Sequence, residues 1–200
     1  MSDYFKNINE IKFEGENSVN PLSFRFYDEN KIIMGKKMKD HLRFATCYWH
    51  TFTWPGLDPF GGSTFDRPWM TGGDPLKMAE MKLNEAFDFF QKIKTPFFCF
   101  HDRDISPEGS TYKETQNNFF HIIDLMESKM EETGIQLLWG TANAFSHKRY
   151  MSGASTNPDP EVFAYKAAQV KDCMDATMRL GGQNYVLWGG REGYETILNT

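Results

Sequence analysis

Short apolar runs alternate along this chain with longer segments of helical periodicity. Two of the helical segments begin with the dipeptide Asp-Pro, at Asp74 and at Asp159, where Asp suits the N-cap and Pro suits the first helical position. The runs predict strands at Leu42–Tyr48, Phe97–Phe100, Ile135–Trp139 and Tyr185–Trp188. Strands joined through helices predict an α/β fold with a parallel sheet and right-handed crossovers.

The helical segments each carry an apolar face that predicts the buried side. The first face consists of Leu76, Ala79, Leu83, Ala86, Phe87, Phe90 and Ile93. The second helix, over about 110–132, has Phe119, Ile122, Ile123, Met126 and Met130 on its face and ends at Gly134. The third face consists of Phe163, Ala167, Val170, Met174 and Met178.

Two architectures fit this order: a doubly wound open sheet and half of a (β/α)₈ TIM barrel. No GxGxxG or GxxxxGK[ST] motif follows a strand, so the nucleotide-binding versions of the open sheet are not supported. All four strand ends carry large or titratable side chains, namely Trp49, His101, Trp139 and Trp188. A barrel would gather them around one central pocket, and eight strands take about 250 residues. We therefore expect an arm over residues 1–41 and the first four β/α units of a TIM barrel over residues 42–200.

Composition limits the class of partner and the compartment. The chain has 22 Lys and Arg against 27 Asp and Glu, a net charge of −5, and no basic stripe, which argues against nucleic acid as a partner. Its three cysteines are far apart and form no CxxC motif, which favours a reducing compartment. No signal peptide or membrane-spanning run is apparent, so we expect a cytoplasmic protein with no membrane partner.

His101 and Asp104 follow the strand Phe97–Phe100, at the sheet edge where ligands bind in parallel α/β folds. A carboxylate can fix the tautomer of an imidazole and stabilise its cation, which predicts a catalytic pair. The alternative is structural: a strand-end histidine bonded to backbone, with Asp104 capping a loop or a helix. One histidine with nearby Asp residues does not predict a metal site.

Aromatic rings at strand ends predict a sugar pocket. Trp49, Trp139 and Trp188 occupy equivalent positions, and indole faces stack on the apolar faces of sugars. Thr141 and Asn143 could supply polar contacts, or they could simply form a turn. For each tryptophan taken singly, the alternative role of an ordinary core aromatic remains open.

Two further polar groups follow the later strands. Arg191 and Glu192 come after a Gly-Gly pair and are interpreted as structural, in a position to clamp a loop. The cluster His147-Lys148-Arg149 is interpreted as a solvated loop face.

Four segments in order closely resemble xylose isomerase, in the longer, second-class form that has an N-terminal extension. The segments are CYWHTFTWPGLDPFGG, PFFCFHDRDISPEG, LLWGTANAFSHKRYMSGASTNPDPEVFAYKAAQVK and NYVLWGGREGYETILNT. The resemblance runs from about residue 20 to the end. It implies a (β/α)₈ barrel, a homotetramer, and interconversion of D-xylose with D-xylulose and of D-glucose with D-fructose. The sugar ring opens, and a hydride then moves between C1 and C2 with the help of two divalent cations, Mg²⁺, Mn²⁺ or Co²⁺.

The resemblance also implies roles for individual residues. His101 would bind the sugar and assist ring opening, with Asp104 hydrogen-bonded to it. Thr141 would touch a substrate hydroxyl, and Phe60 would project into the pocket of a neighbouring subunit. The pocket wall would consist of Trp49, Trp139, Phe145 and Trp188.

The family's metal ligands come from later strands, so none is expected within residues 1–200. Two functional readings follow: a portion of a metal-dependent sugar isomerase, or a non-catalytic, truncated chain that lacks the metal site. A third reading, a related metal-dependent barrel that acts on damaged DNA, is disfavoured by the lack of a basic surface.

Overall fold

A four-stranded parallel sheet forms the centre of the computed structural model, which describes residues 4–193. The strands lie in the order β3-β4-β5-β6, and each pairs in parallel with its neighbour. Their bounds are Ala45–Cys47 for β3, Phe97–His101 for β4, Gln136–Thr141 for β5 and Asn184–Tyr185 for β6. The prediction of four adjacent parallel strands is therefore confirmed, and the molecule is a mixed α/β structure.

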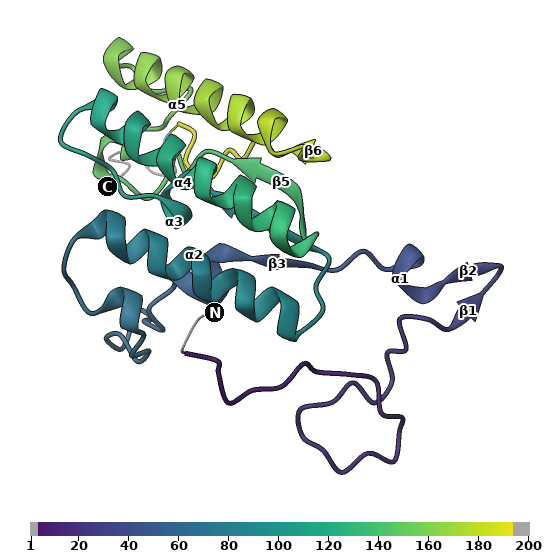
Figure 1. Ribbon diagram of the computed structural model, residues 1–200. Helices are drawn as coiled ribbons and strands as arrows, with labels where there is room; N and C mark the ends of the chain where they lie inside the picture. The colour runs from purple at the N-terminus through teal and green to yellow at the C-terminus, as the bar shows by residue number, and fades with distance from the viewer. Residues whose placement is uncertain (1–3, 194–200) are drawn as a thin grey trace.

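Three long helices lie side by side on one face of this sheet (Figure 1). They are α2, Pro75–Lys92; α4, Tyr112–Thr133; and α5, Pro160–Arg179. Shorter elements connect them: the π-helix η1, Trp49–Thr53; the 3₁₀ helices η2, Pro68–Met70, and η3, Lys148–Tyr150; and α3, Asp102–Ile105. Each crossover thus brings the chain back to the same end of the next strand, as a parallel sheet requires.

The helix ends follow the predicted capping chemistry. Asp74 Oδ1 accepts from the backbone N–H of Leu76 at 2.9 Å, and Asp159 Oδ1 accepts from that of Glu161 at 2.9 Å. Gly134 ends α4 with a φ of 74°, a left-handed conformation that glycine adopts without steric cost. The Asp-Pro signals therefore located two helix starts correctly.

Two strands are shorter than predicted, and β5, at Gln136–Thr141, is shifted along the chain from the predicted run Ile135–Trp139, so Trp139 lies within the strand and Thr141 ends it. The run Leu42–Tyr48 pairs only over Ala45–Cys47, because η1 begins directly after it. The run Tyr185–Trp188 pairs only at its start: β6 meets β5 through Trp139 and Gly140. Among the described strands β6 is the last of the sheet, so it has a partner on one side only, and the chain beyond Val186 leaves the ladder.

The core between sheet and helices is dominated by phenylalanine. Phe98 of β4 stacks on Phe90 of α2 with ring centroids 5.6 Å apart and planes 14° apart. Phe87 meets Phe98 edge to face at 5.4 Å, and all three side chains are buried. Offset and edge-to-face aromatic pairs stabilise beyond their buried area by about 0.5–1.5 kcal/mol each. The predicted faces of α2 and α4 are confirmed as buried for most of their residues.

The predicted face of α5 is wrong for most of its residues, although Val170 packs against the core. Phe163, Met174 and Met178 are exposed, by 51%, 44% and 69%. The side of α5 that packs inward instead consists of Gln169, Cys173, Ala176 and Thr177. Periodicity finds an apolar stripe but cannot tell which neighbour covers it. In this chain the sheet and α4 cover the more polar, small-residue side.

The three cysteines are free thiols, of which Cys99 and Cys173 are buried and Cys47 is half-buried. Cys47 of β3 and Cys99 of β4 are register partners on adjacent strands, and Cys173 lies on the inner side of α5. Burial raises the pKa of Cys99 to about 12 and raises the pKa of Cys173 well above its ordinary value. These two thiols are therefore unreactive in the folded chain.

The arm before β3 packs on the C-terminal end of α2. Its regular elements are β1, Ile32–Ile33, paired antiparallel with β2, Lys36–Lys37, and the short helix α1, Met38–His41. Ile11 donates its backbone N–H to the carbonyl of Lys92 at 2.7 Å, and Lys92 Nζ donates to the carbonyl of Ile8 at 2.6 Å. Lys94 pairs with Glu10 at 2.8 Å. These contacts bind the arm to its own sheet-and-helix layer.

Replacing Gly140 of β5 by alanine is expected to destabilise the chain by about 1–3 kcal/mol, because a methyl group has no room there. A Cβ at this position would collide with Thr177 Oγ1 and approach the Phe100 ring to 3.2 Å. Chemical denaturation measures the loss. Gly62→Ala is the matched control, since no atom lies within 4 Å of its added Cβ. Equal unfolding free energies for the two variants would contradict the packing argument.

Candidate functional site

His101 and Asp104 meet at the carboxyl end of β4. His101 Nδ1 lies 2.7 Å from Asp104 Oδ2, and the same oxygen accepts the backbone N–H of His101 at 3.0 Å. A carboxylate oxygen can only accept, so the ring hydrogen belongs on Nδ1 and the lone pair on Nε2. The short helix α3 turns the chain directly after His101, which carries Asp104 back to the ring.

The surroundings of Asp104 are desolvated. Burial lowers the pKa of Lys82 on α2 to about 8, while the negative charge of Asp104 acts in the opposite direction. Burial also raises the pKa of Tyr48, and the Asp104 charge adds to that rise. Because charges interact more strongly where water is excluded, the Asp104 carboxylate fixes the His101 ring more firmly than a surface carboxylate would.

Three aromatic rings surround His101. Trp49, the first residue of η1, lies with its ring centroid 4.7 Å from that of His101. Trp139 of β5 lies 5.4 Å from Trp49, and Phe145, in the loop after β5, lies 5.3 Å from His101. Trp49 follows β3, whereas Trp139 lies within β5 and Phe145 in the loop after it, so the parallel sheet brings rings from two strands to His101 of β4. Trp49, Trp139 and Phe145 are all partly exposed, which leaves ring surface for a ligand.

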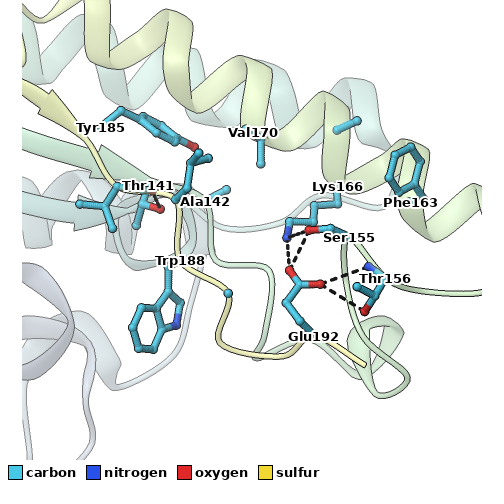
Figure 2. Close-up of a pocket in the computed structure, with 14 residues that line it drawn as sticks. Thr141, Ala142, Ser155, Thr156, Phe163, Lys166, Val170, Tyr185, Trp188 and Glu192 are labelled. Atoms are coloured by element: carbon cyan, nitrogen blue, oxygen red, sulfur yellow. Dashed lines mark hydrogen bonds and ion pairs between the residues drawn. The ribbon is translucent and has the colours of Figure 1, made fainter. Parts of the chain in front are cut away.

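A cavity of about 680 Å³ lies beside this cluster, between α5 and the segment after β6 (Figure 2). Thr141 and Trp188 both line it. Thr141 is buried, and its hydroxyl donates to the carbonyl of Val186, so it can offer a ligand only an acceptor. Trp188 is 56% exposed; an added Cβ on Gly190 would touch both the Trp188 indole and the Phe145 ring, which places these two rings near each other.

Phe60 lies apart from His101, at the tip of the long loop between η1 and η2. Its side chain is 100% exposed. Asp58 shapes the tip: its Oδ1 accepts the backbone N–H of Phe60 at 2.7 Å, and its backbone bridges to Gly61. A fully exposed phenylalanine on an ordered turn can contact another molecule but cannot contribute to this chain's own core.

The interpretation of His147-Lys148-Arg149 as a solvated face is wrong for Arg149. Its guanidinium pairs with Glu108, and it lies over the Tyr165 ring of α5 at 3.9 Å. Tyr165 also donates its hydroxyl to Glu108 at 3.2 Å. This cluster ties the loop after β4 to the loop after β5. No sequence pattern marks this cluster, because its members are 16 to 57 residues apart along the chain.

Glu192 clamps the segment after β6, as the sequence allowed. Its carboxylate accepts from Lys166 Nζ at 2.6 Å, from Ser155 Oγ at 2.7 Å and from the backbone N–H of Thr156 at 3.1 Å (Figure 2). Burial opposes its ionisation, but the hydrogen bonds and the charge of Lys166 outweigh this and lower the pKa of Glu192 to about 2. The ion pair therefore joins α5 to two loops.

Glu192→Gln is expected to lower thermal stability at pH 7, with a difference that disappears on acidification. A carboxyl group whose pKa is lowered by folding stabilises the chain at pH values above its ordinary pKa of 4.5. This contribution is lost as the pH falls toward 2. Melting curves of both proteins between pH 7 and pH 2 measure it. Lys166→Met should show the same convergence with the parent. A stability difference that does not change with pH would contradict the assignment.

No cluster of three or more His, Cys, Asp or Glu side chains within residues 4–193 could hold a metal ion. The acidic groups near the strand ends are already engaged: Asp104 by His101, Asp102 by Arg103, and Glu192 by Lys166. A catalytic dication needs several converging oxygen or imidazole ligands. The described residues therefore do not fit such a metal.

Within residues 4–193, no helix is both long and apolar enough to cross a bilayer.

Comparisons with known proteins give a consistent result. No protein-family model matches the chain. Among curated proteins, it is 63% identical over 200 residues to a xylose isomerase of Photobacterium profundum, covering 100% of this chain and 46% of the relative. It is 58% identical to one of Roseobacter denitrificans with the same coverage, and 59% identical over 197 residues to one of Allorhizobium ampelinum, covering 98% of this chain and 45% of the relative. The chain spans about half the length of these relatives.

Proposed function

We propose that this chain, whose whole length is homologous to the N-terminal half of curated xylose isomerases, acts as that half of a sugar isomerase. The activity would interconvert D-xylose and D-xylulose, and also D-glucose and D-fructose. The observation that supports it most directly is the His101–Asp104 pair, at 2.7 Å, inside a group of three aromatic rings. Binding a sugar requires a concave aromatic surface, and opening its ring requires an oriented imidazole.

In this proposal the parallel sheet is the first half of a (β/α)₈ barrel. The four strands would be its first four, and the remaining strands would come from the part of the relatives that this chain does not span. Arrangement of the strand ends around one centre would make the cluster near His101 part of the substrate pocket. The exposed side of α5 and the one-sided strand β6 fit an edge that continues into further strands.

His101 would act on the sugar ring. Ring opening needs a proton removed from the anomeric hydroxyl and one delivered to the ring oxygen, and an imidazole can serve both needs. With its Nδ1 hydrogen directed to Asp104, His101 has Nε2 available as the base toward the sugar. Asp104 would hold the ring in this tautomer and stabilise the cation that forms.

The aromatic residues would shape the pocket. Trp49, Trp139, Phe145 and Trp188 would stack on the apolar faces of the sugar. Thr141 would accept a hydrogen bond from a substrate hydroxyl, since its own hydrogen is directed to Val186. Phe60, fully exposed at its loop tip, would enter the pocket of a neighbouring subunit in a homotetramer.

The isomerisation itself would need two divalent cations, Mg²⁺, Mn²⁺ or Co²⁺. The described residues do not fit a metal, so the ligands of these cations would have to come from the rest of the protein. We assign no step of the reaction in this chain to the cations.

A chimaeric isomerase tests the proposal. Residues 1–200 replace the matching segment of the Photobacterium profundum relative, and ketose formation from D-xylose is followed with added Mg²⁺ or Mn²⁺. Turnover comparable to that of the unaltered relative is expected. A chimaera that folds and assembles like the relative but forms no ketose would contradict the proposed function.

A further inference from the structure

Asp102 is the most completely buried carboxylate beside the candidate site, with 1% of its surface exposed. It directly follows His101 but turns away from it, toward the inside of the helix layer. All of its partners donate to it, and they come from three separate segments of the chain. A buried carboxylate is energetically costly unless its oxygens are fully hydrogen-bonded, so Asp102 requires a fixed set of partners.

Both oxygens of Asp102 are saturated. Oδ1 accepts the backbone N–H of Asn143 at 2.7 Å and that of Arg103 at 2.9 Å. Oδ2 accepts from Gln169 Nε2 at 2.7 Å and lies 2.8 Å from Arg103 Nη2. The guanidinium balances the charge, while Asn143 and Gln169 supply strong bonds to an ionised acceptor. Asp102 therefore joins the end of β4 to the loop after β5 and to α5.

Asn143 passes this constraint on to the aromatic cluster. Its side-chain Oδ1 accepts from the backbone N–H groups of Phe145 at 3.3 Å and Ser146 at 3.0 Å, and from Ser146 Oγ at 2.9 Å. This turn sets the direction of Phe145, whose ring lies 5.3 Å from that of His101. A displaced Asn143 backbone would therefore displace Phe145 as well.

Gln169 of α5 hydrogen-bonds to the same loop from the helix layer. Its Nε2 donates to the carbonyl of Asn143 at 3.0 Å as well as to Asp102, and its Oε1 accepts from the Tyr150 hydroxyl at 2.6 Å. Both ends of the loop, at Asn143 and at Tyr150, are thus bonded to one buried amide. Gln169 is 3% exposed, so water does not compete for these bonds.

We propose that Asp102, supported by Gln169, is a positioning residue that holds Phe145 against His101 for the isomerase reaction. This inference rests on the proposed function, but its geometric part can be tested without it. Asp102 contacts no reacting atom in this scheme. It acts through the peptide N–H of Asn143, so the position of its oxygen matters more than its charge.

Two substitutions separate position from charge in the chimaeric isomerase. Asp102→Ala removes the acceptor for Asn143 and is expected to lower kcat for xylose by about 100-fold, as small misplacements in active sites do. Asp102→Asn keeps an Oδ1 that can accept the Asn143 N–H but turns a donor toward Gln169 Nε2 and Arg103 Nη2, so its kcat should lie between those of the Ala variant and the parent. An Asn variant that is as impaired as the Ala variant would overturn the positioning role.

Asp172→Asn is the matched control. Asp172 also accepts from a tyrosine and an amide, the Tyr112 hydroxyl at 2.6 Å and Gln116 Nε2 at 3.1 Å, but these bonds join α4 to α5 and involve neither Asn143 nor Gln169. It should lower the melting temperature without lowering kcat. An equal fall of kcat in this control would show that general loosening of α5, and not the position of Phe145, affects turnover.

Hydrogen exchange supplies a readout that does not depend on activity. In Asp102→Ala the backbone amides of residues 143–146 should exchange about 10–100-fold faster, as the loss of a charge-assisted hydrogen bond predicts. They should keep the parental rate in Asp172→Asn. If Asp102→Ala does not fold, Gln169→Leu should accelerate the same amides.

The two proposals fail in different ways. A chimaera without isomerase activity would refute the proposed function, while exchange at residues 143–146 would still decide whether Asp102 holds the loop. Parental exchange and parental kcat in Asp102→Ala would overturn the inference and leave the proposed function intact.

Discussion

Replacing His101 by asparagine is expected to lower xylose turnover by the chimaeric isomerase about 10²–10⁴-fold. Asparagine can still donate to Asp104 Oδ2, which now lies 2.7 Å from the ring nitrogen, so the local structure should persist. It cannot act as a base near neutral pH, so the proton transfers of ring opening would lose their catalyst. Steady-state kinetics, with melting temperature as the check on folding, measure the effect.

The chain offers a matched control for this substitution. His121 of α4 also pairs with a carboxylate at 2.7 Å, that of Glu80 on α2, but on the exposed surface of the helix layer. His121→Asn should leave turnover unchanged. Parental turnover in His101→Asn would show that His101 has only a structural role, and the proposed mechanism would be lost.

Residues 1–200 by themselves are expected to form no ketose from xylose, even with excess Mg²⁺ or Mn²⁺. Within the described range no group of acidic or imidazole side chains converges as a dication requires. The nearest acids already have partners, and one of them, Asp104, is needed by His101. The assay compares the purified chain with the chimaera, with and without metal.

The same chain should also associate readily with itself or with a complementary chain. Strand β6 has one neighbour among the described strands, and Leu187, Trp188 and Phe163 beside it are 79%, 56% and 51% exposed. Exposed sheet edges next to apolar surface promote association. Metal-dependent ketose formation by the purified chain, free of host enzyme, would overturn the prediction that the chain alone is inactive. It would require a metal site that the described residues do not show.

Local patterns predicted the sheet and helix starts well. The four strands and their parallel order follow from short apolar runs separated by helical segments, and Asp74 and Asp159 cap their helices as expected. His101 and Asp104 were also predictable as a pair, because three residues of chain and one short helix bring them together. In each case the determining contacts lie close together in the sequence.

Contacts across the chain account for what the sequence missed. Asp102 bonds to residues 41 and 67 positions away, and no motif marks such a network. Arg149 resembled a solvated loop residue because its partners Glu108 and Tyr165 belong to other elements. The reversed face of α5 has the same origin: periodicity is a property of one helix, whereas burial depends on what lies against it.

The two buried thiols can be used to detect local opening of the folded chain. Cys99 lies in the middle of the sheet and Cys173 on the inner side of α5, and both have raised pKa values. A thiol reagent can label them only when the surrounding layer separates, so the labelling rate measures how often that happens. If Cys173 is modified before Cys99, α5 detaches while the sheet remains closed. The order of modification, read by mass spectrometry, would therefore reveal which layer of the chain gives way first, without any introduced probe.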